Sequence, residues 1–126
     1  MGFESTSALD GRVAVLHGSS LAAQQDWRRL ADVAVLTGAS GRMAAVLLDV
    51  RGATFNPAGF EADLIAAALG GFGTVAIVSG PGVSYGCARR VTVTAELRGS
   101  VAAAFQDEGE AWEWLRSQVD GEGVAK

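Results

Sequence analysis

The chain has 126 residues, of which 49% are hydrophobic and 19% charged, and its formal net charge is −4. This length and composition are typical of a globular protein with its own core, so we expect a single domain over residues 1–126. The positive charges are scattered arginines and one lysine, Lys126, with no basic stripe along the chain. Such a distribution excludes nucleic-acid binding as a leading function.

Metal and membrane functions are also disfavoured. A single histidine, His17, makes a protein-built zinc site improbable, and a single cysteine, Cys87, excludes an internal disulfide. No stretch approaches the ~20 apolar residues that cross a bilayer, and the first residues lack the features of a signal peptide. We therefore expect no metal, no cofactor, no membrane span and a cytoplasmic location.

The first half of the chain predicts a hairpin, a helix and a buried strand. Two extended segments, residues 3–8 and 12–17, flank the turn pair Asp10-Gly11. The next apolar residues recur at helical spacing, on Trp27, Leu30, Ala31, Ala34 and Val35. Residues 44–50 then form a continuous apolar run broken only by Asp49, which predicts a strand covered on both faces.

The next segments alternate between helix and strand. Asn56-Pro57 is a favourable helix start, and we expect that helix to end at Gly70-Gly71, with one apolar face formed by Phe60, Leu64, Ala67 and Ala68, widened by Ile65 and Leu69. Residues 74–78 predict a short buried strand. A turn at Ser79-Gly80-Pro81-Gly82 leads into a helix over about 83–97, predicted to bury Val83, Cys87 and Val91.

The chain ends in a predicted strand and helix. The strand spans residues 101–105, and Asp107 and Glu110 form a D-x-x-E pattern typical of a helix cap. That helix carries Ala111, Trp114 and Leu115 on its apolar side, and we expect the tail from about Gly121 to be frayed.

This element order, ββαβαβαβα, predicts an α/β fold. We expect a mixed five-stranded sheet with an N-terminal antiparallel hairpin, a mostly parallel remainder, and about four helices around it.

Three segments in register resemble the SpoIIAA-like family of small bacterial proteins, which has the STAS fold. They are Val46-Leu47-Leu48-Asp49-Val50-Arg51-Gly52, then Thr74-Val75-Ala76-Ile77-Val78, and the closing Phe105-Gln106-Asp107-Glu108-Gly109-Glu110-Ala111-Trp112-Glu113-Trp114-Leu115. Between the last two, residues 83–89 look like a helix start found in one branch of the family. The resemblance covers roughly residues 11–117.

The resemblance implies a regulatory role, with one departure from the family pattern. In STAS antagonists of anti-sigma factors, a kinase phosphorylates a serine that follows the central strand. Here the equivalent loop, residues 52–59, contains no serine, and Thr54 is its only hydroxyl. The usual phosphorylation switch is therefore not expected. Other members of this branch are grouped with lipid-binding folds, which implies an apolar-ligand carrier as an alternative.

The candidate binding residues cluster after two predicted strands. They are Asp49, Arg51, Thr54, Asn56, Ser79, Gly80, Ser84, Tyr85 and Arg89. Asp49 is expected to accept loop N–H groups or to pair with Arg51, because the acidic pair and the lysine of a phosphoacceptor site are missing. Ser84 is expected to cap its helix rather than to bind phosphate, and Tyr85 and Arg89 are i, i+4 neighbours that could form a polar patch.

Four further residue types bear on function. Gly86 inside a predicted helix suggests close packing, with ligand approach as the alternative. Trp112 and Trp114 lie about 200° apart on a helix, so we expect one to face the core and the other to be exposed or half-exposed, where it could form a homodimer contact. Cys87 is interpreted as a core thiol, which leaves His17 as a possible acid or base.

The function expected from the sequence is therefore non-enzymatic: a regulatory or protein-interaction module that uses the loops at 51–59 and 79–85. A carrier or sensor of a lipid or other small apolar ligand is the alternative. A small enzyme using His17 or Cys87 is the third possibility.

Overall fold

The computed structural model describes residues 2–8, 12–19, 31–35, 45–52, 55, 57 and 59–124. Its elements, in chain order, are β1 (Gly2–Ala8), β2 (Val13–Ser19), a helical segment at residues 31–35, β3 (Ala45–Gly52), α2 (Gly59–Leu69), β4 (Thr74–Val78), α3 (Val83–Leu97), β5 (Val101–Phe105) and α4 (Glu108–Val124). The α/β class expected from the sequence is confirmed.

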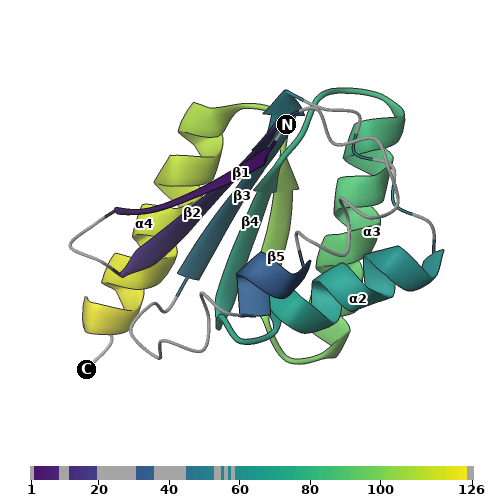
Figure 1. Cartoon of the computed structure of the whole chain (residues 1–126). Helices are drawn as coiled ribbons and strands as arrows, with labels where there is room; N and C mark the ends of the chain where they lie inside the picture. Colours follow the sequence, from purple (N-terminus) through teal and green to yellow (C-terminus); the bar gives the residue numbers. More distant parts are fainter. Residues whose placement is uncertain are drawn as a thin grey trace.

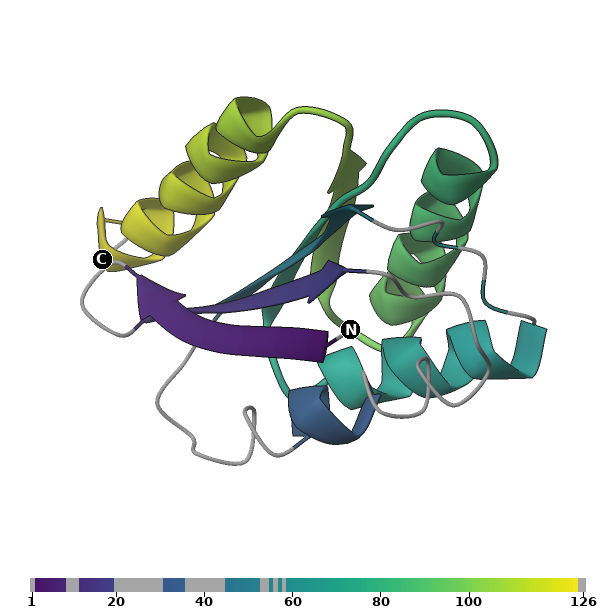
Figure 2. The same ribbon diagram turned by 45° about the horizontal axis from the view of Figure 1, so that its top comes forward.

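The strands lie in the sheet in the order in which they occur in the chain, β1-β2-β3-β4-β5. Strands β2 to β5 are parallel to one another, and β1 pairs antiparallel with β2 at one edge. Figure 1 shows α2 and α3 on one face of this sheet and α4 alone on the other, an arrangement that the rotated view in Figure 2 makes clear. The sheet is therefore the middle layer of three.

Alternate side chains of the central strands enter two separate cores, because successive residues of a strand point to opposite faces. On the side of α2 and α3, the strand residues Ala14, Leu16, Val46, Leu48, Val50, Val75 and Ile77 are buried. On the side of α4, the buried strand residues are Val13, Ala45, Leu47, Ala76 and Val78. Strands β3 and β4 are thus apolar on both faces, as their continuous apolar sequences predicted.

Helix α3 has the predicted bounds but buries a different face. Val83 is 65% exposed, whereas Ser84, Ala88, Val91, Thr92 and Ala95 are buried. The prediction that Val83 faces the core was wrong, whereas Val91 is buried as predicted and Cys87 is half-buried; the rest of the contact face is formed by smaller residues. Serine and alanine let the helix lie close to the sheet, and the Ser84 hydroxyl is satisfied there by the backbone N–H of Phe55, 3.0 Å away.

Helix α2 differs from the prediction in the same way. It buries Ala62, Ile65, Ala66, Ala68 and Leu69, while Leu64 is 42% exposed and Ala67 is exposed. The apolar residues of this helix occupy most of its circumference, so their spacing alone did not define one inward face. The predicted start at Asn56 falls on a residue outside those described, and the helix itself begins at Gly59.

Helix α4 covers its face of the sheet without a neighbouring helix among the described residues, and this changes the roles expected of its two tryptophans. Ala111, Leu115 and Val119 are buried beneath it, and Trp112 and Trp114 are both half-buried against the same core. A helix without neighbours can contact the sheet with both flanks. The expectation that one tryptophan packs inward and the other is exposed or half-exposed therefore holds only in part, because both pack against the core and both stay half-buried.

One hydrogen bond of the predicted capping pattern of α4 is present, from the backbone of Glu110 to the side chain of Asp107. The carboxylate of Asp107 accepts a hydrogen bond from the backbone N–H of Glu110, with Asp107 Oδ2 2.9 Å from the nitrogen. Asp107 thus satisfies one of the N–H groups that the first turn leaves without a helical partner.

We predict that Asp107→Ala lowers the free energy of unfolding by about 1 kcal/mol, because the cap hydrogen bond is lost. Asp107→Asn is the matched control and should stay within a few tenths of a kcal/mol, since asparagine caps equally well. Urea titration followed by circular dichroism measures both values. Equal losses in the two variants would show that the charge, not the cap, is what stabilises the helix start.

Candidate functional site

The candidate site lies where the parallel strands reach their carboxyl ends. His17, Asp49, Val78 and Phe105 are register partners in one row across β2, β3, β4 and β5. The α4 face of this row holds an imidazole, a carboxylate and two apolar side chains. Because α4 begins three residues after Phe105, its first turn lies close to the same row. Topology therefore brings polar groups from both halves of the chain together.

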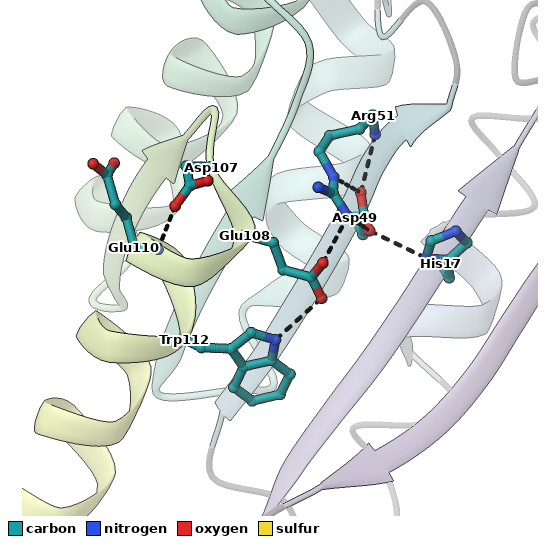
Figure 3. Close-up of polar contacts among 7 residues, drawn as sticks. All are labelled: His17, Asp49, Arg51, Asp107, Glu108, Glu110 and Trp112. Carbon is teal, nitrogen blue, oxygen red and sulfur yellow. Dashed lines mark hydrogen bonds and ion pairs between the residues drawn. The ribbon is translucent and has the colours of Figure 1, made fainter.

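Asp49 is the centre of the polar contacts in Figure 3, although it is only 2% exposed. Arg51, two residues later on the same strand face, turns back to it. The Nε atom of Arg51 donates to Asp49 Oδ1 over 3.0 Å, and Nη2 donates to Oδ2 over 2.9 Å. The backbone N–H of Arg51 also donates to Oδ1, over 3.1 Å. Of the two predicted alternatives for Asp49, the structure shows Arg51, whose side chain and whose own backbone N–H, within β3, both donate to the carboxylate.

His17 forms the second ion-pair contact of Asp49. Its Nδ1 atom lies 3.2 Å from Asp49 Oδ2, and its side chain is 50% exposed. The carboxylate therefore fixes the orientation of the imidazole ring and leaves the other ring nitrogen, Nε2, for an external group. This is an arrangement in which a buried acid positions an exposed histidine.

The network continues from Arg51 to helix α4. Arg51 Nη2 also donates to Glu108 Oε1 over 2.8 Å, and the indole Nε1 of Trp112 donates to Glu108 Oε2 over 3.2 Å. The side chains of Arg51 and Glu108 are 39% and 44% exposed. Glu108 thus connects the first turn of α4 to the end of β3. We call His17, Asp49, Arg51, Glu108 and Trp112 the carboxyl-edge network.

The ionisation of Asp49 reflects opposing effects. Burial raises the pKa of the carboxyl group, but the hydrogen bonds from the Arg51 side chain and backbone, with the positive charges of Arg51 and His17, outweigh burial and lower the pKa below the ordinary 3.8. The hydrogen bond to Asp49 likewise raises the pKa of Arg51 above its ordinary value. Both partners are therefore charged at neutral pH.

The other predicted site residues do not belong to the carboxyl-edge network. Ser79 is fully buried and donates its hydroxyl hydrogen bond to the carbonyl of Gly80, which is half-buried. Ser84 is not a helix cap, since the cap residue of α3 is Gly82, with φ 73°, and Ser84 Oγ accepts the N–H of Phe55. Tyr85 is half-buried and Arg89 exposed on α3. Thr54 and Asn56 lie outside the described residues.

His17 and Cys87 do not form a catalytic pair. Cys87 packs against the core beneath α2 and α3, whereas His17 contacts Asp49 on the α4 face. The sheet separates the two side chains. In the part of the chain that the structure describes, no group of three or more His, Cys, Asp or Glu side chains is arranged to hold a metal ion. Within the same residues, every helix is too short or too polar to span a bilayer.

Sequence reasoning missed two members of the network, Glu108 and Trp112. Glu108 appeared only within the closing segment, residues 105–115, that resembles the SpoIIAA-like family, and Trp112 was considered as a core or dimer residue. A signal was available, because a helix that follows the last parallel strand begins at the carboxyl edge of the sheet. Which strand end Glu108 reaches depends on how α4 crosses the sheet.

We predict that Asp49→Ala lowers the free energy of unfolding by about 2–3 kcal/mol, because the hydrogen bonds that Arg51 donates to the buried, charged carboxylate are lost. Glu108→Gln is the control, and it should cost less than about 1 kcal/mol because the Glu108–Arg51 pair is partly exposed to solvent. Urea unfolding at neutral pH measures both. A Glu108→Gln loss as large as that of Asp49→Ala would contradict the central place of Asp49.

The lowered pKa of Asp49 makes its contribution to stability depend on acidity. A carboxyl whose folded pKa lies below its unfolded pKa of about 3.9 stabilises the fold above that pH and loses this contribution as the pH falls through the folded pKa. We predict that the difference in unfolding free energy between wild type and Asp49→Asn is constant near neutral pH and shrinks as the pH falls below about 4. A difference that grows on acidification would contradict the assigned direction.

Comparison with known proteins supports the fold. No protein-family model matches the chain, and no curated protein is significantly similar to it. Among solved structures, it is similar to an uncharacterized protein of the DUF3478 family, with a SpoIIAA-like fold, from Shewanella loihica PV-4. That similarity has a TM-score of 0.56 and 17% sequence identity, and it covers 90% of this chain and 92% of the other. The chain has a SpoIIAA-like α/β fold, as the resemblance implied.

Proposed function

We propose that the protein is a non-enzymatic regulatory module that recognises a protein partner through its carboxyl-edge network. The observation that carries this proposal is the organisation of the network around one buried carboxylate. Asp49 holds the side chains of His17 and Arg51, and Arg51 holds Glu108, while all three outer side chains stay 39–50% exposed. Such side chains present hydrogen-bonding groups at positions that are already fixed before binding.

The chemistry of this surface suits a protein better than a small ion. It combines a guanidinium, an imidazole, a carboxylate and the half-buried indole of Trp112. Arginine and tryptophan are over-represented among residues that dominate binding energy at protein interfaces. Because the charges of Arg51 and Asp49 are already paired, the surface offers mixed polarity rather than a single-sign field for an anion or a metal.

The neighbouring loop extends the proposed surface. The turn at residues 79–82 connects β4 to α3 at the same edge, with Pro81 and Gly82 exposed and Tyr85 half-buried just beyond them. The described serines nearby, Ser79 and Ser84, are buried and hydrogen-bonded, so they are poor substrates for a kinase. We therefore propose partner recognition without the serine phosphorylation of STAS antagonists.

The carrier alternative receives less support. An apolar ligand needs room between α2, α3 and the sheet, and that space holds Phe55, Ile65, Leu69 and Phe72, each 1% exposed or less. All four belong to the core cluster on this face. Close packing of large side chains at this position favours the interaction module.

The test is affinity capture from the native cell with three baits. We expect wild type to recover a protein that the double variant His17→Ala/Glu108→Ala loses, because two of the three exposed side chains of the network are removed while Asp49 and Arg51 keep their pair. Glu113→Ala is the matched control, since it removes an exposed carboxylate elsewhere on α4. Quantitative mass spectrometry of the recovered proteins gives the readout.

Equal recovery by wild type and the double variant would exclude the network as the binding surface. Recovery of no partner, together with a measurable enzymatic turnover, would overturn the proposal as a whole.

A further inference from the structure

The outer face of α3 forms a second exposed surface, which shares no residue with the carboxyl-edge network. Gly86, Arg90, Val93 and Leu97 are spaced by four, three and four residues, so they form one stripe along the helix. All four are exposed, Val93 by 49% and Leu97 by 83%. The stripe is offset by two residues from the buried set Ser84, Ala88, Val91 and Ala95 and so lies on the opposite side of the helix. An amphipathic helix ordinarily places polar residues there.

Gly86 creates a hollow within this stripe. A Cβ atom added at Gly86 would meet no atom within 4 Å, so the glycine is not required by packing inside the molecule. The expectation of close packing at this residue was therefore wrong. The hollow is shallow and wide open to solvent, has a volume of about 390 Å³ and is lined by Gly86, Arg89, Arg90, Val93 and Thr94. One turn beyond Val93, Leu97 projects into solvent from the same stripe.

We propose that α3 is the contact surface between two copies of this chain, packed against each other as antiparallel helices. In that register Gly86 lies opposite Leu97 of the second copy, and Arg90 lies opposite Val93 of the second copy. The exposed leucine of each copy then enters the hollow of the other. A contact in which residue i meets residue j, and j meets i, closes as a two-fold dimer. The four-three-four spacing is that of helices packed by knobs into holes.

Charge complementarity supports a second copy as the occupant. Arg89 and Glu96 are both exposed, and they precede Arg90 and Leu97 on one flank of the stripe. In the antiparallel register, Arg89 of one copy lies beside Glu96 of the other, and the symmetry makes this pair twice. Opposite charges on the flanks of a helix pair set partner choice and orientation. A parallel pairing would instead place Arg89 beside Thr94 of the second copy and would form no such ion pair.

An anionic membrane would use the same arginines differently. The exposed side of α3 and its C-cap carry three arginines, Arg89, Arg90 and Arg98, and one acid, Glu96, in a chain whose net charge is −4. An identical helix provides Glu96 with a partner in Arg89, whereas an anionic membrane surface would repel that acid. The contact is short, at 15 residues of helix per copy, so we expect a dissociation constant in the micromolar range.

The test is sedimentation velocity over a concentration series, from low micromolar to several hundred micromolar, with the intact chain of 12.9 kDa. Wild type should pass from monomer to dimer. Gly86→Gln fills the hollow, and we expect it to weaken dimerisation at least about tenfold without harming the fold, because nothing surrounds that position. Arg89→Glu alone and Glu96→Arg alone should each weaken it by opposing like charges.

The double variant Arg89→Glu/Glu96→Arg restores the opposite-charge pairs and should regain the wild-type dimer. This recovery distinguishes the α3 contact from any other surface, including a tryptophan-mediated contact through α4. Wild type that stays monomeric throughout, or a dimer that survives Gly86→Gln and both single charge reversals, would overturn the proposal. Binding of wild type to vesicles of phosphatidylglycerol, lost with Arg89→Glu and not regained in the double variant, would also overturn it.

The proposal does not depend on the proposed function, because the carboxyl-edge variants His17→Ala/Glu108→Ala leave α3 unchanged. We expect that double variant to dimerise like wild type. Loss of dimerisation in it would contradict the separation of the two surfaces.

Discussion

Strand β3 is apolar on both faces until Asp49, and the burial of that one carboxylate determines the polar end of the molecule. A carboxylate that is 2% exposed has to be compensated by hydrogen bonds or an opposite charge. Arg51 supplies both, because its position two residues later places it on the same strand face. The exposed positions of Arg51, His17 and Glu108 then follow from their contacts with Asp49 or with each other.

The contact between Arg51 and Glu108 is possible because helix α4 covers the second face of the sheet. Ala111 and Leu115 of helix α4 pack over β3 and β4. The first residue of the helix, Glu108, reaches the strand ends where Arg51 lies. The tilted ring contact between Phe105 and Trp114, with centroids 5.6 Å apart, fixes one flank of the helix. The bond from Trp112 to Glu108 orders the other flank. The contact between α4 and the sheet therefore contains both apolar core residues and the polar network.

The two proposed surfaces differ in how they are built. At the carboxyl edge, side chains from β2, β3 and α4 meet only after the chain has folded, and a buried acid holds them in place. On α3, all the proposed contact residues belong to one helix, and their spacing is a local property of the sequence. The first surface suits recognition of a different protein, whereas the second is complementary to itself.

The sequence by itself determined the buried strands, the bounds of α3 and β5 and the cap at Asp107, because each follows from residues close together in the chain. For Asp49 it left two kinds of partner open, loop N–H groups or Arg51, and the structure shows Arg51. The tertiary structure alone decided which faces of α2 and α3 are buried, since Val83 and Leu64 are exposed while serine and alanine pack inward. It also decided that Asp49 meets His17 and that Arg51 meets Glu108. These contacts join residue 17 to residue 49 and residue 51 to residue 108, and only the order of strands in the sheet and the crossing of α4 bring such distant positions into hydrogen-bonding range.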